Sequence, residues 1–594
     1  MQKLWTIQDW QQAYRSGDLQ LTDLYKYVDD ITQVHHSEHN DHAWIEIATT
    51  IQIRHQITAL KGLNSDLLPL YGIPFAVKDN IDVAGFHTTA ACPEASYLAE
   101  QDATVVAKLK KAGAIVVGKT NLDQFATGLV GVRSPYGAVK NSFNPDYISG
   151  GSSSGSAVVV AKGVVPFALG TDTAGSGRIP AGHNNIVGLK PTKGWFSTTG
   201  LIPACRTLDV ISIFALTVDD SWTVAQIMQG FDVEDEYSRQ HPENVVSHFA
   251  LGKIAIPKQL EFYGDDFAQQ AFSQAVKRVE TLGYQVESID FSVFQQLAAA
   301  LYQRSWVAER TVAVESLISR EQAHPVIAQI IAQADQFSAT DVMQDEYDRA
   351  MLARQIQQIL SQYDALLVPT APTIYRIAEV EADPIQKNSH MGTYTNFVNF
   401  ADLSALALPN VIRADGLPSG VTFIARAWHD QALANFGQIW QQASTLDLGT
   451  SSQPYVKSTT LSSPQSIKLA VVGAHLTGMP LNFQLTTRGG VLLEKTQTAP
   501  HYQFFALSNS VPPKPALQYV EQGKSIEVEV WDIPIASFGK IVAEVPAPLG
   551  IGNVQLLDGT WVKGFICEPY AFAQATDITH FGGWKNYMIA QSIR

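Results

Sequence analysis

The sequence has 594 residues, 46% hydrophobic and 16% charged, which is too long for one hydrophobic core and typical of a globular protein with two or three domains. Its 41 basic and 56 acidic residues give a formal net charge of -15, which would repel a phosphate backbone and argues against nucleic acid as a partner. No signal peptide and no apolar run of about 18 residues is found, so we expect a cytoplasmic protein without a membrane span.

The first part of the chain has the pattern of an α/β domain. Two short helices are expected within 7–31, joined at residues 16–18. Beyond them, apolar runs alternate with amphipathic segments. Strands are expected at 73–77, 114–117 and 164–169, and helices at 104–112 and 156–162. This alternation predicts a mixed or parallel sheet covered by helices on both faces, in a domain that we place at residues 1–445.

Three segments of this domain carry residues suited to acyl transfer. Lys78 ends the first apolar run, residues 149–156 read SGGSSSGS, and residues 170–180 read GTDTAGSGRIP. Glycine allows sharp turns, so two Gly/Ser loops on either side of a strand can bring hydroxyl and backbone N–H groups together. Either loop alone is equally typical of a flexible segment. The combination with a strand-end lysine favours catalysis.

These motifs resemble the amidase signature family, which has a strand-end lysine, a GGSS segment and a GTD-x-x-GS segment in this order. Ser152 and Ser176 are 24 residues apart, as in that family. The resemblance implies the family's fold, with Ser176 as nucleophile, Ser152 as proton relay on a cis peptide bond, and Lys78 as base. Lys78 can accept a proton only if burial lowers its pKa, so we expect it to be buried.

The turn before the nucleophile is expected to bind the developing oxyanion. The backbone N–H groups of Thr173, Ala174 and Gly175 directly precede Ser176 and can stabilise a tetrahedral intermediate. The neighbouring Asp172 and Arg178 are expected to hold the shape of the loop. No metal or cofactor is predicted, because Cys92, Cys205 and Cys567 have neither paired nor metal-type spacing.

Three features that resemble allophanate hydrolases narrow the range of candidate substrates. First, the nucleophile loop reads TAGSGR, where general amidases usually have GGSIR. Second, Tyr302 and Arg310 lie about two turns apart on an expected helix at 294–318, so both can face one pocket, and Arg310 would bind the carboxylate of allophanate. Gly128 is expected to contribute backbone contacts. The alternative for Arg310 is a surface ion pair, for example with Glu309.

Third, the C-terminal part resembles the C-terminal domain of allophanate hydrolases. Residues 446–465 are rich in Ser, Thr and Pro and are expected to be a linker. Residues 466–594 contain short β-type runs and predict a small β-rich domain, which the resemblance relates to the γ-glutamyl cyclotransferase-like barrel. Residues 473–482 and 564–568 carry the likeness.

The resemblance implies a two-step reaction. The amidase domain would hydrolyse allophanate to ammonia and N-carboxycarbamate, and the C-terminal domain would assist the decarboxylation that follows. His475 is the expected acid–base residue of the second step. Two alternatives stay open: His475 is a hydrogen-bonded turn residue, and decarboxylation is uncatalysed.

Other functions and partners also stay open. The main alternative is a general amidase or a glutaminase-type amidase, and an inactive scaffold is a further one. The resemblance implies a homodimer. No methionine adjoins a lysine, so the Met-Lys-Met biotin site of a fused urea carboxylase is absent from this sequence. We therefore expect allophanate to come from a separate urea carboxylase or from a biuret-producing enzyme.

Overall fold

The computed structural model describes residues 4–63, 65–242, 245–456, 466–508 and 511–592. They fall into two compact units. One lies within residues 1–241 and 251–460, and the other within 242–250 and 461–594. In the described part of the chain, no helix is both long and apolar enough to cross a membrane.

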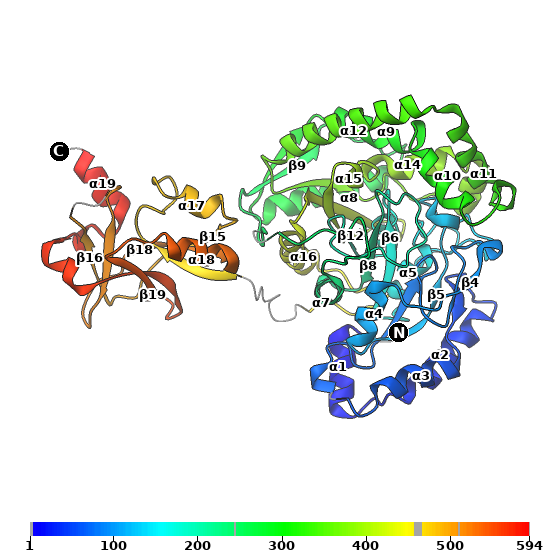
Figure 1. The fold of residues 1–594 in the computed structure, drawn as a ribbon, viewed down its shortest axis with the longest axis horizontal. Helices are drawn as coiled ribbons and strands as arrows, with labels where there is room; N and C mark the ends of the chain where they lie inside the picture. The colour runs from blue at the N-terminus through cyan, green and yellow to red at the C-terminus, as the bar shows by residue number, and fades with distance from the viewer. Residues whose placement is uncertain (1–3, 64, 243–244, 457–465, 509–510, 593–594) are drawn as a thin grey trace. The chain divides into compact units, whose positions relative to one another are not determined.

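A mixed sheet of eleven strands forms the core of the first unit (Figure 1). The strand order is β1-β5-β2-β6-β8-β7-β12-β13-β11-β9-β10. The strands are β1 (Trp44–Ile47), β2 (Pro74–Lys78), β5 (Ile115–Thr120), β6 (Phe167–Asp172), β7 (Val187–Lys190), β8 (Val210–Ala215), β9 (Lys253–Pro257), β10 (Gln285–Ile289), β11 (Ala365–Pro369), β12 (Leu403–Ile412) and β13 (Pro418–Arg426), with a separate pair β3 (His87–Thr88) and β4 (Tyr97–Leu98).

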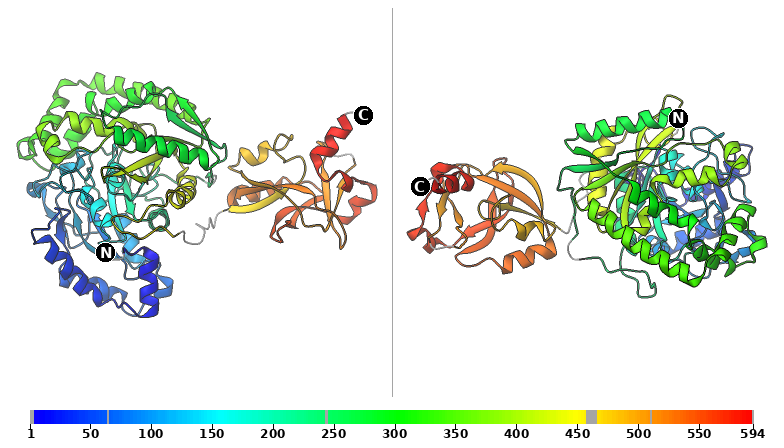
Figure 2. Two further views of the ribbon diagram at one scale, coloured as in Figure 1. Left: turned by 180° about the vertical axis from the view of Figure 1, so that it is seen from behind. Right: turned by 90° about the horizontal axis from the view of Figure 1, so that it is seen from above.

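Helices surround this sheet, as two further views make plain (Figure 2). They are α1 (Ile7–Ser16), α2 (Asp23–His35), α3 (Thr50–Leu60), α4 (Thr104–Lys111), α5 (Ser154–Ala161), α6 (Ile179–His183), α7 (Val218–Met228), α8 (Asp266–Thr281), α9 (Ser292–Gln303), α10 (Val307–Glu315), α11 (Pro325–Ile331), α12 (Ala339–Leu360), α13 (Ile377–Ala382), α14 (Gln386–Met391), α15 (Phe397–Phe400) and α16 (Asp430–Ser444). The strands β2, β5, β6 and β8 are buried along their whole length, which explains the apolar runs that they contain. The predicted α/β architecture is confirmed.

The prediction of one helix at 294–318 is wrong, because the helix is interrupted between α9 and α10. Arg304 adopts an extended backbone, and its guanidinium donates to Asp348 of α12 at 2.7 Å. The N–H of Ser305 donates to the carboxylate of Asp345 at 2.9 Å. The carboxylate of Asp345 on α12 thus takes the place of a helical acceptor for the Ser305 N–H. Tyr302 ends up on α9 and Arg310 on α10.

The second unit is rich in β-structure. One sheet has the order β15-β18-β14-β20-β19 and another the order β17-β16-β21. The strands are β14 (Ser466–Val471), β15 (Val491–Gln497), β16 (Tyr502–Ala506), β17 (Pro515–Tyr519), β18 (Glu527–Pro534), β19 (Leu549–Gln555), β20 (Trp561–Cys567) and β21 (Thr576–Asp577), and the helices are α17 (Phe483–Thr486), α18 (Ile535–Ala543) and α19 (Trp584–Ser592). The likeness to the γ-glutamyl cyclotransferase-like barrel stays a prediction.

The predicted linker at 446–465 is only partly described, since residues 457–465 lie outside the described residues. Its first part packs on the first unit instead of standing free in solvent. The side-chain amide of Asn185 donates to the carbonyls of Asp447 and Gly449, at 3.0 and 2.9 Å, and Leu448 is buried. Pairing of these backbone groups holds the segment in place. The proposed domain boundaries stay a prediction.

Candidate active site

Lys78 and Ser152 meet in the interior of the first unit. Lys78 ends β2, and its Nζ is hydrogen-bonded to the Ser152 hydroxyl at 2.8 Å and to the Thr171 hydroxyl at 2.6 Å. All three side chains are buried. Burial lowers the pKa of Lys78 to about 7, although the carboxylates of Asp123 and Asp209 act in the opposite direction. A large share of this amine is therefore neutral at pH 7.

The loop that carries Ser152 has a specific backbone geometry. The Gly151–Ser152 peptide bond is cis. The carboxylate of Asp123 accepts the N–H groups of Gly131 and Arg133, at 2.9 and 3.0 Å, and lies directly against Gly151. A side chain at position 151 would place its first carbon 2.1 Å from that carboxylate. Asp123 thus requires glycine here and fixes the backbone next to Ser152.

Ser176 lies in a turn, residues 173–176, which we call the nucleophile turn. The Asp172 carboxylate accepts two hydrogen bonds from the Arg178 guanidinium, at 2.8 and 2.9 Å, and one from the Gly177 N–H at 3.0 Å. Arg178 also donates to the carbonyl of Thr395. These groups are buried, so the guanidinium fork holds the turn from its C-terminal side. The shape-holding role expected of Asp172 and Arg178 fits these contacts.

The predicted oxyanion hole lies in the same turn. In the described part of the chain, the backbone N–H groups of residues 173–176 have no hydrogen-bond acceptor. The Thr173 hydroxyl donates to Asp209 at 2.5 Å, and the other oxygen of that carboxylate accepts the N–H groups of Ala204 and Cys205. Burial raises the pKa of Asp209 to about 6. Unpaired N–H groups on an anchored turn are suited to bind a developing negative charge.

The two predicted substrate-binding side chains also meet, although they lie on different helices. The Arg310 guanidinium donates to the Tyr302 hydroxyl at 3.3 Å and to the Thr127 hydroxyl at 3.0 Å, and its centre lies 5.0 Å from the middle of the Tyr302 ring. Arg310 is only 1% exposed, which excludes the alternative of a surface ion pair. Gly128, next to Thr127, packs against the Asp123 carboxylate.

A cavity of about 500 Å³ lies beside this pair and is lined by polar side chains that include Tyr302, Asn388 and Asn396. Asn388 accepts the N–H of Leu129 at 2.8 Å, so the segment around Gly128 borders the cavity. Thr395, adjacent to Asn396, packs against Gly175. Tyr302 lines this cavity, whereas Arg310 and the nucleophile turn are not among its lining residues.

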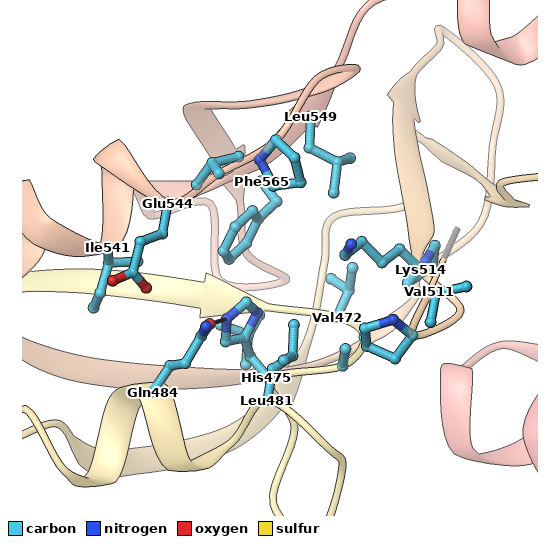
Figure 3. A pocket seen from close by; sticks show the side chains of 17 residues that line it. Val472, His475, Leu481, Gln484, Val511, Lys514, Ile541, Glu544, Leu549 and Phe565 are labelled. Carbon is cyan, nitrogen blue, oxygen red and sulfur yellow. Dashed lines mark hydrogen bonds between the residues drawn. The ribbon is translucent and has the colours of Figure 1, made fainter. Parts of the chain in front are cut away.

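His475 belongs to a different cavity, of about 230 Å³, in the second unit (Figure 3). Its ring stacks on Phe565, with 5.0 Å between centroids, and Nε2 lies 2.8 Å from the side-chain oxygen of Gln484. The amide oxygen can accept a hydrogen bond from a protonated Nε2. Burial lowers the pKa of His475. Apart from Lys514, Glu544 and Gln484, the lining is mostly apolar.

Sequence reasoning did not identify Thr171 or Asp123. Thr171 lies within the GTD motif and was not assigned a part, although it is hydrogen-bonded to Lys78. Asp123 follows the buried strand β5, and a polar residue after a buried strand is a signal that was available. Among the residues described, no group of three or more His, Cys, Asp or Glu side chains is placed to hold a metal ion.

Comparisons with known proteins agree with this geometry. The amidase family model matches residues 26–434, and the allophanate hydrolase C-terminal domain model matches residues 467–589. Urea amidolyase of Saccharomyces cerevisiae is 45% identical over an alignment of 606 positions. The alignment covers 98% of this chain and 33% of that protein. The chain thus spans about a third of the length of the curated relatives that it matches first.

Solved structures are similar as well. A serine-to-alanine variant of Kluyveromyces lactis allophanate hydrolase is 40% identical, with a TM-score of 0.81 and 99% of each chain covered. A glutamyl-tRNA(Gln) amidotransferase component from Thermotoga maritima is 28% identical, with a TM-score of 0.61, over 76% of this chain and 98% of that one. The likeness to the amidotransferase component therefore leaves part of this chain uncovered.

Proposed function

Because this chain belongs to the amidase family and carries an allophanate hydrolase C-terminal domain, we propose that it hydrolyses allophanate to ammonia and N-carboxycarbamate. One observation carries the assignment of the catalytic residues. A buried lysine with a lowered pKa is hydrogen-bonded to Ser152, which follows a cis peptide bond in the GGSS loop. Such a lysine is a base and not a surface cation.

In the first step, Ser176 Oγ attacks the terminal carboxamide carbon of allophanate. Its proton passes to Ser152, whose own proton passes to the neutral amine of Lys78. The negative charge that develops on the carbonyl oxygen is bound by the N–H groups of Thr173, Ala174 and Gly175. The relay then returns the proton to the leaving nitrogen, and ammonia departs. Water attacks the acyl-enzyme by the same route and restores Ser176.

Substrate selection rests on the arginine–tyrosine pair. A guanidinium can bind a carboxylate through two parallel hydrogen bonds, and the carboxylate is what distinguishes allophanate from a neutral amide. In the described part of the chain, Arg310 donates to two hydroxyl groups and its Nε has no acceptor, so it retains capacity for an anion. We assign Gly128 to the wall of this pocket through its backbone.

The second step belongs to the C-terminal unit. N-carboxycarbamate loses CO2, and the nitrogen that gives up the carboxyl group gains a proton. His475 is placed in a mostly apolar cavity and transfers this proton. An apolar lining also disfavours a charged carboxylate, which promotes its loss as neutral CO2. Carbamate then breaks down to a second ammonia and CO2.

A homodimer is part of this proposal. Helix α12 exposes Met343, Tyr347 and Met351, which follow one another at intervals of four residues and so share one face. An exposed apolar stripe of this kind suits an interface between two copies. Supply of allophanate by a urea carboxylase or by a biuret-producing enzyme, and a cytoplasmic location, stay predictions.

One assay tests the function. Ammonia release by purified protein is measured with allophanate, biuret, malonamate and glutamine as separate substrates. We expect allophanate to give the highest kcat/KM. A preference for glutamine or another neutral amide would favour the general amidase alternative instead.

A further inference from the structure

Asn399 contacts the backbone at the start of the nucleophile turn. Its side-chain amide donates to the carbonyl of Asp172 at 2.7 Å and to the carbonyl of Thr173 at 3.0 Å. Asn399 is fully buried and lies 227 residues beyond Asp172 in the chain, so the contact is made by tertiary folding alone. Both hydrogens of the amide are used on this one stretch of backbone.

These two hydrogen bonds control the direction of the N–H groups. In a planar peptide unit the C=O and N–H bonds point in opposite directions, so a fixed carbonyl also fixes the following N–H. The carbonyls of Asp172 and Thr173 precede the N–H groups of Thr173 and Ala174. These N–H groups are free of acceptors within the described residues, whereas their carbonyls are engaged.

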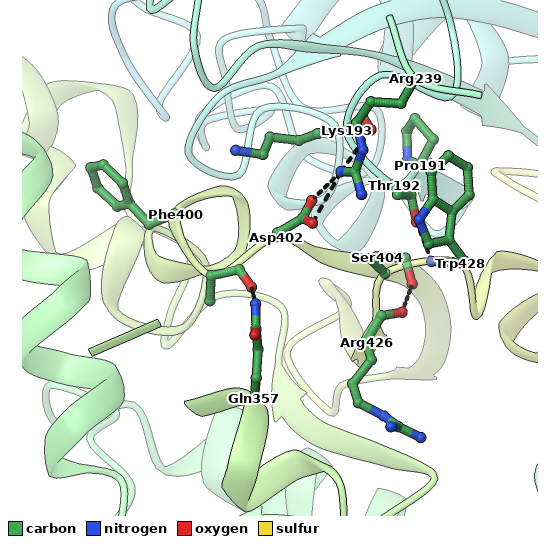
Figure 4. Close-up of polar contacts among 12 residues, drawn as sticks. Pro191, Thr192, Lys193, Arg239, Gln357, Phe400, Asp402, Ser404, Arg426 and Trp428 are labelled. Carbon is green, nitrogen blue, oxygen red and sulfur yellow. Dashed lines mark hydrogen bonds and ion pairs between the residues drawn. The ribbon is translucent and has the colours of Figure 1, made fainter. Parts of the chain in front are cut away.

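The helix that carries Asn399 is itself held in place. It is α15, a four-residue helix that leads into β12 through Asp402. Gln357 donates to the carbonyl of Ala401 at 3.0 Å, and Arg239 donates to both oxygens of Asp402, at 2.8 and 3.0 Å (Figure 4). Side chains from two other parts of the unit therefore hold the end of α15. A donor on such a support can keep a turn in position during a reaction.

We propose that Asn399 is a positioning residue, which aims the N–H groups of the nucleophile turn at the oxyanion of the tetrahedral intermediate. The inference rests on the proposed role of Ser176 as nucleophile. Packing alone does not explain the residue, because among the described groups its side-chain oxygen has no hydrogen-bond partner. An apolar side chain of similar size would avoid that cost but would leave two carbonyls unpaired.

The test compares Asn399→Asp with a matched control, Asn185→Asp. Asn185 is also buried, and its amide likewise donates to two carbonyls, those of Asp447 and Gly449. Both variants lose two donors at a buried site. Loss of oxyanion stabilisation lowers kcat and spares KM, so we expect kcat for ammonia release to fall about 10- to 100-fold in Asn399→Asp, with KM within about threefold. Asn185→Asp should keep kcat within about twofold.

Two further measurements keep the test decisive. In the Ser176→Ala background, Asn399→Asp should leave the Kd of the unreacted amide unchanged, because the oxyanion does not yet exist. If Asn399→Asp fails to fold, Asn399→Ala is measured in its place. Its kcat is again compared with that of the Asn185 control, provided that the two proteins have the same Tm. An unchanged kcat, or a loss equal to that of Asn185→Asp, would overturn the inference.

The result of the Asn399 test can be distinguished from the result of the substrate assay. Any amide passes through the same oxyanion, so a chain that prefers malonamate would refute allophanate as substrate and still allow the comparison on malonamate. A large kcat loss there supports the role of Asn399. A wild-type chain inactive on both amides would overturn both proposals.

Discussion

The two candidate sites of this chain are built in opposite ways. In the first unit, Lys78, Ser152, Asp172 and Arg178 are all buried, and each is tied to a neighbour by hydrogen bonds. In the second unit, a single histidine with one side-chain partner faces a cavity with mostly apolar walls. We propose that the first site moves protons and binds an anionic transition state. The second offers a histidine ring that can exchange a proton, with Lys514 and Glu544 also on the cavity wall.

This contrast between the two sites bears on the chemistry that we propose for each unit. Amide cleavage needs a nucleophile, a base and an oxyanion hole that are preorganised together, and only a dense buried network provides this. Decarboxylation needs little more than an environment that disfavours charge and a proton for the product. We propose that the second cavity supports that step.

The largest effect is expected at the nucleophile. Ser176→Ala should lower ammonia release by at least about a thousandfold, because the proposed acyl-enzyme forms on the Ser176 hydroxyl. Lys78→Ala and Ser152→Ala should be nearly as severe, and their combination should add little. Ammonia is measured with protein shown to be folded by calorimetry. A tenth of wild-type turnover in Ser176→Ala would end the assignment.

The pH profile gives the next largest effect. The base must be neutral, so kcat/KM should fall by about tenfold per pH unit below the Lys78 pKa of about 7 and level off above it. Asp209→Asn removes a charge that raises the Lys78 pKa and should move the midpoint lower. Profiles from pH 5 to 9 decide this. An activity that still rises steeply at pH 9 would mean that the pKa of Lys78 is not lowered.

Substrate discrimination should respond to Arg310. Arg310→Lys keeps the charge but loses the planar fork, so kcat/KM for allophanate should drop by about 10- to 100-fold. A neutral amide should lose no more than about threefold. Arg304→Lys, which changes a partly exposed arginine on the same segment, is the control. Equal losses on both substrates would assign Arg310 to structure rather than recognition.

The smallest effect is expected in the second unit. His475→Ala should leave the first ammonia release unchanged and slow the decay of N-carboxycarbamate by roughly tenfold, less than usual for acid–base catalysis because the intermediate also decays unaided. Carbon NMR follows the intermediate, with the exposed His580→Ala as control. Equally fast decay in all three proteins would make decarboxylation spontaneous and leave the second cavity with another task.

The sequence predicted the parts of the first site that lie in local motifs. Lys78, Ser152 and Ser176 stand next to glycines and strand ends, and the contact between Lys78 and Ser152 could be anticipated from this pattern. Tyr302 and Arg310 do meet, but not for the predicted reason, because the expected single helix is broken. A one-dimensional pattern does not show that Asp345 of α12 accepts the N–H of Ser305 and that Asp348 binds the Arg304 side chain.

Contacts between distant segments could not be predicted from the sequence. Asn399 reaches the nucleophile turn from a segment 226 residues away, and a lone asparagine in the stretch 397–402 gives no local signal. Asp123 holds the backbone near Ser152 from a loop that has no motif of its own. The α/β pattern and the β-rich C-terminal texture were readable, because burial of a sheet face imposes its periodicity on the residues themselves.

The burial of Lys78 also has a consequence for the path of the proton. The amine is closed off from bulk water, and its described hydrogen bonds lead only to Ser152 and Thr171. A proton that it receives from the nucleophile therefore has one way back, through Ser152 to the departing nitrogen. Bulk pH sets the charge of the site before substrate arrives, whereas within the proposed turnover the serine proton leaves with the first ammonia and a proton from the attacking water restores Ser176. The first ammonia released from each allophanate would leave with a hydrogen that came from the enzyme's own serine.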